Sequence, residues 1–367
     1  MAPSSYQVLY SFAGGSDGAY PQAPLIDLKG TLYGTTKGGG AGGNGTVFRV
    51  TTTGIEKVLY SFAGGSDGAY PEASLTKVNG TLYGTTNGGG ASGYGTVFSV
   101  TTTGTEKSIY SFAGGSDGAY PQASLTNVNG TLYGTTVYAG AHGFGTVFRV
   151  TTTGIEKVLY SFAGGSDAAN PKAGLIDVNG TLYGTTYAGG NPACLSGCGT
   201  VFSVTTAGAE KVLYSFAGGS DGEHPVASLI EVNGTLYGTT RGGTGNVRNG
   251  TVFGVTTTRI EKVLHLFTGR RYDGEYPEAS LIKLKGRLYG TTWGGTRAAQ
   301  NGAIFSVTMT GTEKVLYGFA DGSDGENPEA SLINVNGTLY GTTLDGGGGA
   351  CSTRRTGGCG TVFAFTP

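Results

Sequence analysis

The chain consists of seven copies of one motif, and this repetition limits the folds it can adopt. The segment LYGTT recurs with its tyrosine at Tyr33, Tyr83, Tyr133, Tyr183, Tyr237, Tyr289 and Tyr340. The spacing is 50 residues for the first three steps and 51 to 54 residues afterwards. A period near 50 with strand-like content is typical of a radial array of small sheets. We therefore expect an all-β, seven-bladed propeller that forms a single domain over residues 1–367.

One repeat can be divided into four antiparallel strands, and residues 71–112 serve as the example. Residues 73–78 form the first strand, and Asn79-Gly80 is the strongest two-residue hairpin signal because both positions require positive φ. Strands over 81–86, 95–101 and 106–112 follow. These strands are apolar on both faces, which predicts blades that stack face to face.

The two ends of the chain predict how the ring closes. Residues 7–12 read as a fourth strand that lacks the three strands before it, whereas residues 360–365 read as a third strand that lacks a fourth. We therefore expect the N-terminal strand 7–12 to complete the C-terminal blade, 328–366.

Composition excludes several classes of partner. There are 23 basic and 24 acidic residues, for a net charge of −1, and no stretch is strongly basic, so we expect no nucleic-acid binding. No apolar run approaches about 18 residues, so we expect no membrane span. Residues 1–5 are too short and too polar to serve as a signal peptide. We expect a monomer.

The four cysteines form two local pairs, each of which brackets an insertion in one loop. We expect the disulfides Cys194–Cys198 and Cys351–Cys359, and hence a secreted protein in an extracellular or periplasmic compartment. The alternative is four free thiols. The pairs fall in the fourth and seventh repeats, too far apart to share a zinc ion. We therefore expect no metal site and no cofactor.

The repeat unit, LYSF-GGSDG-YP followed by NGTLYGTT-GG-GTVF, resembles the Gloeo–Verruco tandem-repeat family over almost the whole chain. The resemblance implies the propeller fold and a secreted or surface-anchored location. It implies no catalytic residues, and we expect this chain to differ from the family in lacking an anchor segment.

Turn lengths distinguish the two faces of the expected ring. The connections between strands 1 and 2 and between strands 3 and 4 are tight, whereas the 2–3 and blade-to-blade connections are long and emerge together. The loop over residues 65–71 is nearly invariant among the repeats. It could form a repeated ligand pocket. We favour a structural role, in which Asp67 makes an Asx turn, Gly68 adopts positive φ and Pro71 presets the next strand.

Three positions on this long-loop face break the symmetry: the residue after LYGTT and the residues on either side of the inter-blade proline. Aromatic rings beside charged groups suit sugars, and the alternative is drift on solvated loops. Our candidate ligand-binding residues are Trp293, Arg241, Tyr187, His224, His142, Tyr138 and Lys172. Further arginines of these loops are Arg248, Arg297, Arg354 and Arg355.

These observations favour a secreted, non-enzymatic, lectin-like propeller that binds a glycan or another small polar ligand. The first alternative is a carbohydrate-active enzyme on the same face. Its candidate catalytic residues are Glu278, Glu329, Glu72, His224 and Tyr187. A glycoside hydrolase would use the carboxyl pair Glu278 and Glu329, and a polysaccharide lyase would use His224 or His142 with Tyr187. The second alternative is a purely structural module. His265 replaces a strand tyrosine, and we expect it in the core.

Overall fold

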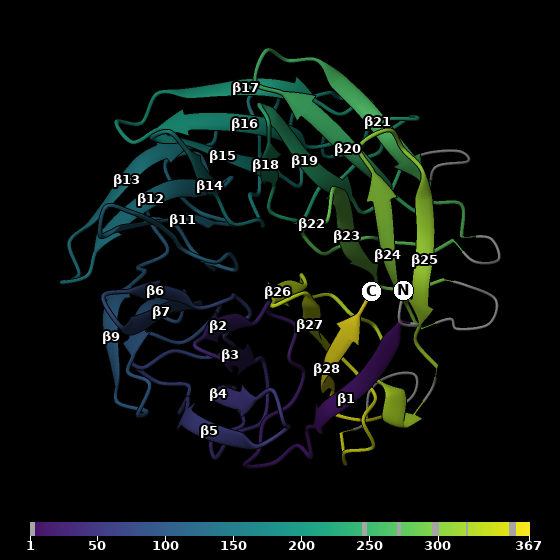
Figure 1. Cartoon of the computed structure of the whole chain (residues 1–367). Coiled ribbons are helices and arrows are strands. Elements are labelled where there is room, and N and C mark those ends of the chain that lie inside the picture. Colours follow the sequence, from purple (N-terminus) through teal and green to yellow (C-terminus); the bar gives the residue numbers. More distant parts are fainter. Residues whose placement is uncertain (1–3, 244–247, 270–272, 296–300, 321, 352–356) are drawn as a thin grey trace.

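The computed structural model describes residues 4–243, 248–269, 273–295, 301–320, 322–351 and 357–367. Seven four-stranded antiparallel sheets are arranged in a ring, as predicted (Figure 1). Within each blade the first strand lies nearest the axis and the fourth lies outermost (Figure 1). A 3₁₀ turn, η2 (Gly322–Asp324), is the one helical element among these residues.

The strands of the first four blades follow the repeat closely. The first blade contains β2 (Ile26–Leu28), β3 (Thr31–Thr36), β4 (Thr46–Thr51) and β5 (Glu56–Ser61). The second contains β6 (Thr76–Val78), β7 (Thr81–Thr86), β8 (Thr96–Val100) and β9 (Glu106–Ser111). The third contains β10 (Thr126–Val128), β11 (Thr131–Thr136), β12 (Thr146–Thr151) and β13 (Glu156–Ser161). The fourth contains β14 (Ile176–Val178), β15 (Thr181–Thr186), β16 (Thr200–Thr205) and β17 (Glu210–Ser215).

The remaining blades keep the same order until the last one. The fifth contains β18 (Ile230–Val232), β19 (Thr235–Thr240), β20 (Thr251–Thr256) and β21 (Glu261–Leu266). The sixth contains β22 (Ile282–Leu284), β23 (Arg287–Thr292), β24 (Ala303–Thr308) and β25 (Glu313–Gly318). The seventh contains β26 (Ile333–Val335), β27 (Thr338–Thr343), β28 (Thr361–Thr366) and, from the other end of the chain, β1 (Ser5–Ser11).

The predicted closure is confirmed. β1 pairs antiparallel with β28, with Ser5 opposite Thr366 and Ser11 opposite Thr361. The two chain ends consequently lie side by side (Figure 1). The strand covers residues 5–11 rather than 7–12, because Phe12 leaves the ladder and donates its backbone N–H to the Gly360 carbonyl at 2.9 Å.

First strands are shorter than the sequence predicts. β6 begins at Thr76, although residues 73–75 were expected to belong to it. The reason is that these residues turn towards the neighbouring blade at the axis. The Ser74 backbone N–H donates to Ser124 Oγ at 3.1 Å instead of pairing with β7.

The apolar core lies between the blades. Between the first two blades, Phe62 and Phe98 make an edge-to-face contact with 5.0 Å between ring centroids, and Leu75 and Leu82 pack beside them. The ring of Phe98 covers Gly84, where a Cβ would lie 2.6 Å from Phe98 Cζ. The LYGTT glycine therefore provides the space for the phenylalanine of GTVF. Both faces of a blade are buried, as the weak alternation of the strands predicts.

A second repeated element, which we call the inter-blade clasp, ties each blade to the next. Tyr60 Oη and the Ala63 N–H donate to Asp67 Oδ2 at 2.9 and 2.7 Å. Glu106, at the start of the next blade's outer strand, faces this pair with a buried Oε1 that has no hydrogen-bond partner among the described residues. Burial, assisted by the charge of Asp67, raises the pKa of Glu106 to about 7.

The clasp clarifies the role of the invariant loop. Asp67 accepts hydrogen bonds from residues 60 and 63, which precede it, so the expected Asx turn is wrong. These contacts nevertheless give Asp67 a structural role in the loop. Gly68 has φ of 101°, as expected. The blade-to-blade loop also pairs with the 2–3 loop through a bridge between Ala69 and Gly88, so the two long connections share one face.

Candidate functional site

The long-loop face is hollowed at the propeller axis. This axial depression has a volume of about 210 Å³. All seven residues that follow the inter-blade prolines line it, together with one residue from a 2–3 loop: Gln22, Glu72, Gln122, Lys172, Val226, Glu278, Glu329 and Arg241. Seven copies of one position thus converge on a single place while differing in chemistry.

The backbone before each proline explains this convergence. The residue before the proline has φ between 55° and 61° in all seven repeats. Positive φ is uncommon for residues other than glycine and has to be held by the surroundings. At Tyr70 the holding contact is a backbone hydrogen bond from its N–H to the Asn44 carbonyl at 2.8 Å. The resulting turn directs the chain, and the residue after Pro71, towards the axis.

Small side chains form the floor. A cavity of about 120 Å³ adjoins the depression, with which it shares six lining residues, and it is otherwise lined by a proline, alanines, serines and a glycine. The Ser280 N–H donates to Ser331 Oγ at 2.8 Å, which continues the pattern seen at Ser74. Seven strands converge here, so only small residues fit and hydrogen bonds connect neighbouring blades.

Two ion pairs position the charged groups of the depression. Lys37 Nζ lies 2.7 Å from Glu72 Oε1, and Arg241 Nε lies 2.7 Å from Glu278 Oε1. Each pair links the residue after LYGTT in one blade to the residue after the proline of the next. The acidic partners are the more buried members, which leaves the two cations at the edge.

Two carboxyl groups of the depression, those of Glu329 and Glu278, have different electrostatic surroundings. Burial, together with the charge of Glu278, raises the pKa of Glu329 to about 8, so Glu329 is mainly protonated at neutral pH. Burial also raises the pKa of Glu278, but Arg241 and Lys172 act in the opposite direction. The depression therefore contains a carboxylic acid, Glu329, that can donate a hydrogen bond, and a second carboxyl group, Glu278, that Arg241 binds.

Lys172, Tyr187 and His224 form a stacked array beside these carboxyl groups. The rings of Tyr187 and His224 are 4.3 Å apart and inclined by 13°. Lys172 Nζ lies 3.9 Å from the centroid of the Tyr187 ring. One face of a ring cannot hold both groups at these distances, so they cover opposite faces of Tyr187. His224 Nδ1 is also bound to the Tyr187 carbonyl at 2.8 Å. Tyr187 therefore positions Lys172 and offers no free face for a sugar.

Exposed aromatic rings gather instead on the loops of the second and third blades. Tyr138, Tyr70 and Phe144 are 49, 43 and 42% exposed. Tyr120 connects Tyr94 and Tyr138, with ring centroids 5.6 and 6.1 Å away. We call the three connected residues Tyr94, Tyr120 and Tyr138 the aromatic patch. Sequence reasoning selected only Tyr138 among them, because Tyr120 belongs to the column before the inter-blade proline and the position of Tyr94, directly before GTVF, was not considered.

The other sequence-based candidates lie in different places. Trp293 packs against Tyr276 with centroids 6.4 Å apart, and it is not among the residues that line the depression. His142 is exposed in the same loop as Tyr138, and Arg248 is exposed in the fifth blade. Arg297, Arg354 and Arg355 lie outside the described residues.

Two polar residues that line the depression, Gln22 and Gln122, were not among the sequence-based candidates, nor was Lys37, the ion-pair partner of Glu72. The signal that could have found the glutamines is their column, since each follows an inter-blade proline like Lys172. His265, expected in the core, is partly buried and joins a clasp through Asp273.

Both predicted disulfides are present. They lie in 2–3 loops and help to position the residues before two prolines. The Cys198 carbonyl accepts from the His224 N–H at 2.8 Å, and the Cys359 carbonyl accepts from the Tyr20 N–H at 2.9 Å. No helix among the described residues is both long and apolar enough to cross a membrane.

Comparison with known proteins places the chain in a family and in a fold. The model of the Gloeobacter/Verrucomicrobia repeat matches residues 1–195 and 194–363, so the chain belongs to this family. Among curated proteins, no sequence matches it.

Solved structures of similar shape are distant in sequence. A proposed 6-phosphogluconolactonase of Bacteroides uniformis is 13% identical, with a TM-score of 0.52 over 80% of this chain and 83% of its own. A luciferin-regenerating enzyme is 11% identical, with a TM-score of 0.50 over 99% of this chain and 95% of its own. A gluconolactonase of Xanthomonas campestris is 11% identical, with a TM-score of 0.48 over 99% and 89%. At these identities the first two comparisons show the fold alone.

Proposed function

We propose that the protein is a secreted, non-enzymatic propeller that binds carbohydrate through its long-loop face. The observation that carries this proposal is the axial depression, where side chains of mixed chemistry from all seven blades converge. A ligand site in a propeller needs a few well-placed polar groups held by a rigid scaffold.

The polar groups of the depression match those of a sugar. Gln22 and Gln122 offer amide donors and acceptors, Glu72 and Glu278 accept, and protonated Glu329 donates. Sugar hydroxyls both donate and accept, so such a mixed set can satisfy several of them. The exposed ring of Tyr138 in the aromatic patch can stack on the apolar face of a further sugar unit.

A glycan array followed by titration calorimetry tests the proposal. We expect binding of oligosaccharides, with Gln122→Ala and Lys172→Met each lowering affinity at least tenfold. Lys107→Met, on the outer strand β9, is the matched control and should bind normally. Tyr138→Ala should weaken binding of longer oligosaccharides, whereas Ile155→Ala, which removes a 71% exposed side chain at a tight 3–4 turn, should not. Absence of binding to any glycan would refute the proposal and favour the purely structural alternative.

One observation favours the alternative of a glycoside hydrolase. Glu278 and Glu329 come from adjacent blades, the charge of Glu278 helps to raise the pKa of Glu329, and Glu278 is bound by Arg241, so the two carboxyl groups have the different surroundings that an acid and a base require. Incubating the bound glycans with the protein distinguishes the two functions. Release of reducing ends that Glu329→Gln and Glu278→Gln abolish, but Glu106→Gln does not, would indicate the enzyme.

The stack of Tyr187 and His224 bears on the lyase alternative. His224 Nδ1 binds the Tyr187 carbonyl, and the two rings lie face to face. This contact uses one of the two imidazole nitrogens and supports a positioning role for His224. Unsaturated products, detected by their ultraviolet absorbance, would overturn this view.

The two disulfides support an extracellular or periplasmic location, since such bonds persist in oxidising compartments. Mass spectrometry of the unreduced protein from its native source tests this point, because four free thiols would contradict it. We also propose that the protein acts as a monomer, which light scattering can check.

A further inference from the structure

One of the inter-blade clasps differs in chemistry from the others. At the junction of the fifth and sixth blades, His265 of β21 takes the place of the clasp tyrosine. Its aspartate partner, Asp273, follows after eight residues, whereas the separation is seven between Tyr214 and Asp221 in the preceding clasp. An imidazole is shorter than a phenol, and the longer loop still brings the carboxylate to it.

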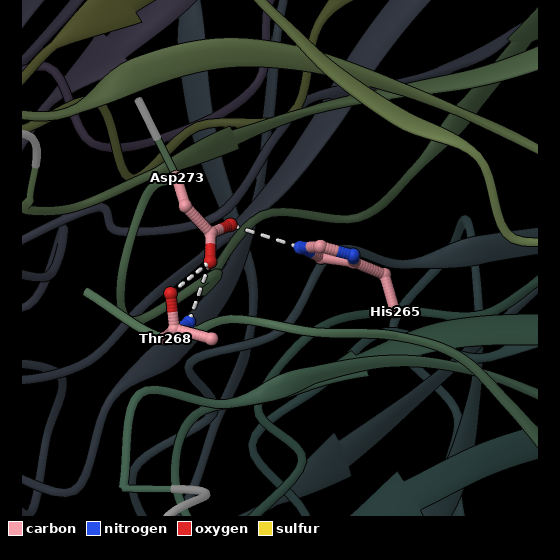
Figure 2. A network of polar contacts seen from close by, with 3 residues as sticks. All are labelled: His265, Thr268 and Asp273. Carbon is pink, nitrogen blue, oxygen red and sulfur yellow. Dashed lines mark hydrogen bonds and ion pairs between the residues drawn. The ribbon is translucent and has the colours of Figure 1, made fainter. Parts of the chain in front are cut away.

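The geometry of this clasp is defined by three hydrogen bonds (Figure 2). His265 Nε2 lies 2.9 Å from Asp273 Oδ1. The Thr268 N–H and Oγ1 donate to Asp273 Oδ2 at 2.7 and 2.5 Å. Thr268 thereby fixes the carboxylate and leaves Oδ1 directed at the imidazole. The ring of Phe267 packs edge-on against His265 at 4.8 Å and restricts its rotation.

Glu313, at the start of β25 in the sixth blade, completes the group. One ligand atom from each of His265, Asp273 and Glu313 lies within 4.8 Å of the other two. Glu313 Oε1 is buried and has no hydrogen-bond partner among the described residues. A buried carboxylate oxygen without a partner is costly unless a proton or a cation satisfies it.

We propose that His265, Asp273 and Glu313 form a zinc-binding site between the fifth and sixth blades. An imidazole nitrogen with two carboxylates is a ligand set suited to Zn²⁺, whereas Ca²⁺ and Mg²⁺ prefer oxygen ligands alone. Bonds of about 2.0–2.2 Å in a tetrahedron separate ligand atoms by roughly 3.3–3.5 Å. The observed 2.9 Å between His265 and Asp273 needs only a small opening, and a ligand atom of Glu313 already lies within 4.8 Å of both. A water molecule would take the fourth position.

The neighbouring clasps explain why the site is confined to this junction. In them a tyrosine faces the same two carboxyl groups, and a phenol binds a metal ion well only after it loses its proton. Burial raises the pKa of Tyr214 further above its ordinary value, so this phenol stays protonated at neutral pH. Thr268 adds the outer hydrogen bonds that commonly orient a ligating carboxylate.

Calorimetry with zinc chloride in chelator-free buffer tests the site on the full chain. We expect one equivalent to bind, and we expect His265→Gln and Glu313→Gln each to lower the affinity at least tenfold. The matched controls are Glu261→Gln, which alters the preceding clasp in the same way, and His142→Gln, which removes an exposed histidine. Both controls should keep the wild-type affinity.

A second readout guards against variants that are merely destabilised. Zinc should raise the unfolding temperature of the wild type and of both controls, because it binds the folded state. The same zinc concentration should raise the unfolding temperature of the two ligand variants much less, because they bind zinc more weakly. Visible absorption of the cobalt-loaded protein should indicate tetrahedral coordination in the wild type and in both controls, but not in the two ligand variants. Absence of zinc binding by the wild type, or equal binding by Glu313→Gln, would overturn the proposal.

Discussion

Closure of the ring by the N-terminal strand can be tested with one pair of matched substitutions. Phe12 follows β1 and Phe112 follows β9, at the same position of two blades. Both side chains are fully buried. Phe12 meets Phe48 of the next blade at 5.0 Å, and Phe112 meets Phe148 at 5.1 Å. The two residues differ in how the chain connects them to their blades. Phe112 follows the third strand of its own blade in the sequence, whereas Phe12 belongs to a segment that joins its blade only through pairing with β28.

The expected magnitude follows from this burial. Replacing a fully buried phenylalanine by alanine costs about 3–5 kcal/mol, through lost transfer free energy and the cavity that remains. The rings of Phe48 on β4 and of Tyr10 on β1 itself lie 5.0 and 5.2 Å from the Phe12 ring, and Phe48 is held by its own blade, which limits collapse of the cavity. If the N-terminal strand is an integral part of the seventh blade, Phe12→Ala and Phe112→Ala should each lower the free energy of unfolding by about 4 kcal/mol.

Guanidinium chloride unfolding, followed by circular dichroism and fluorescence, measures both variants. Equal displacement of the midpoint with an unchanged slope would support a ring that unfolds as one unit. The reasoning would be refuted if Phe12→Ala lowered the free energy of unfolding by less than about 1 kcal/mol while Phe112→Ala lowered it by the full amount. That result would place the N-terminal strand outside the cooperative structure. Deleting residues 1–12 should abolish cooperative unfolding, and an unchanged unfolding temperature would contradict the closure in the same way.

Three further predictions follow from the clasps, the glycines and the disulfides. A carboxyl group with a raised pKa in the folded protein binds its proton more tightly there than in the unfolded chain, so stability falls as the pH rises from about 4.5 to about 7. Acidification from pH 8 to pH 5.5 should therefore raise the midpoint of unfolding, and Glu106→Gln should show a weaker pH dependence than the wild type; equal slopes would contradict the clasp argument. Gly84→Ala would place a Cβ 2.6 Å from the ring of Phe98 and should cost about 1–3 kcal/mol in chemical unfolding, whereas a neutral change would show that the ring can move. The disulfides span only 4 and 8 residues, so reduction should cost less than about 3 kcal/mol and leave the propeller folded. Reduction should nevertheless lower glycan affinity, because the Cys198 carbonyl positions His224, and unchanged affinity would remove this loop from the site.

The fold could be predicted in detail because its determinants are local and repeated. Asn79-Gly80 adopts φ of 49° and 87°, as its hairpin chemistry requires. The unpaired strands at the two ends predicted the pairing of β1 with β28. The errors were of two kinds. Ser74 bonds to the neighbouring blade instead of to its own second strand. Asp67 accepts from residues before it in the chain instead of forming an Asx turn.

The candidate site was only partly predictable. The column after the prolines contains Lys172 and Glu278, but the sequence does not show that this column meets at the axis. Tyr187 and Trp293 occupy equivalent positions of two repeats. Tyr187 is enclosed between His224 and Lys172, whereas Trp293 packs against Tyr276. Which neighbour a side chain meets depends on the identity of residues in the adjacent blade, and no local pattern records it.

The sequence by itself determined the number of blades, the strand order, the closure and the cysteine pairing, because turns, strand patterns and short loops act within one repeat. Only the tertiary structure decided which residues share a site. Lys172 and Glu278 are about two repeats apart along the chain, yet both line the axial depression, and His265 meets Glu313 across a blade junction. The physical reason is that a closed ring brings equivalent positions of distant repeats together, and the charges and burial that set their chemistry arise only there.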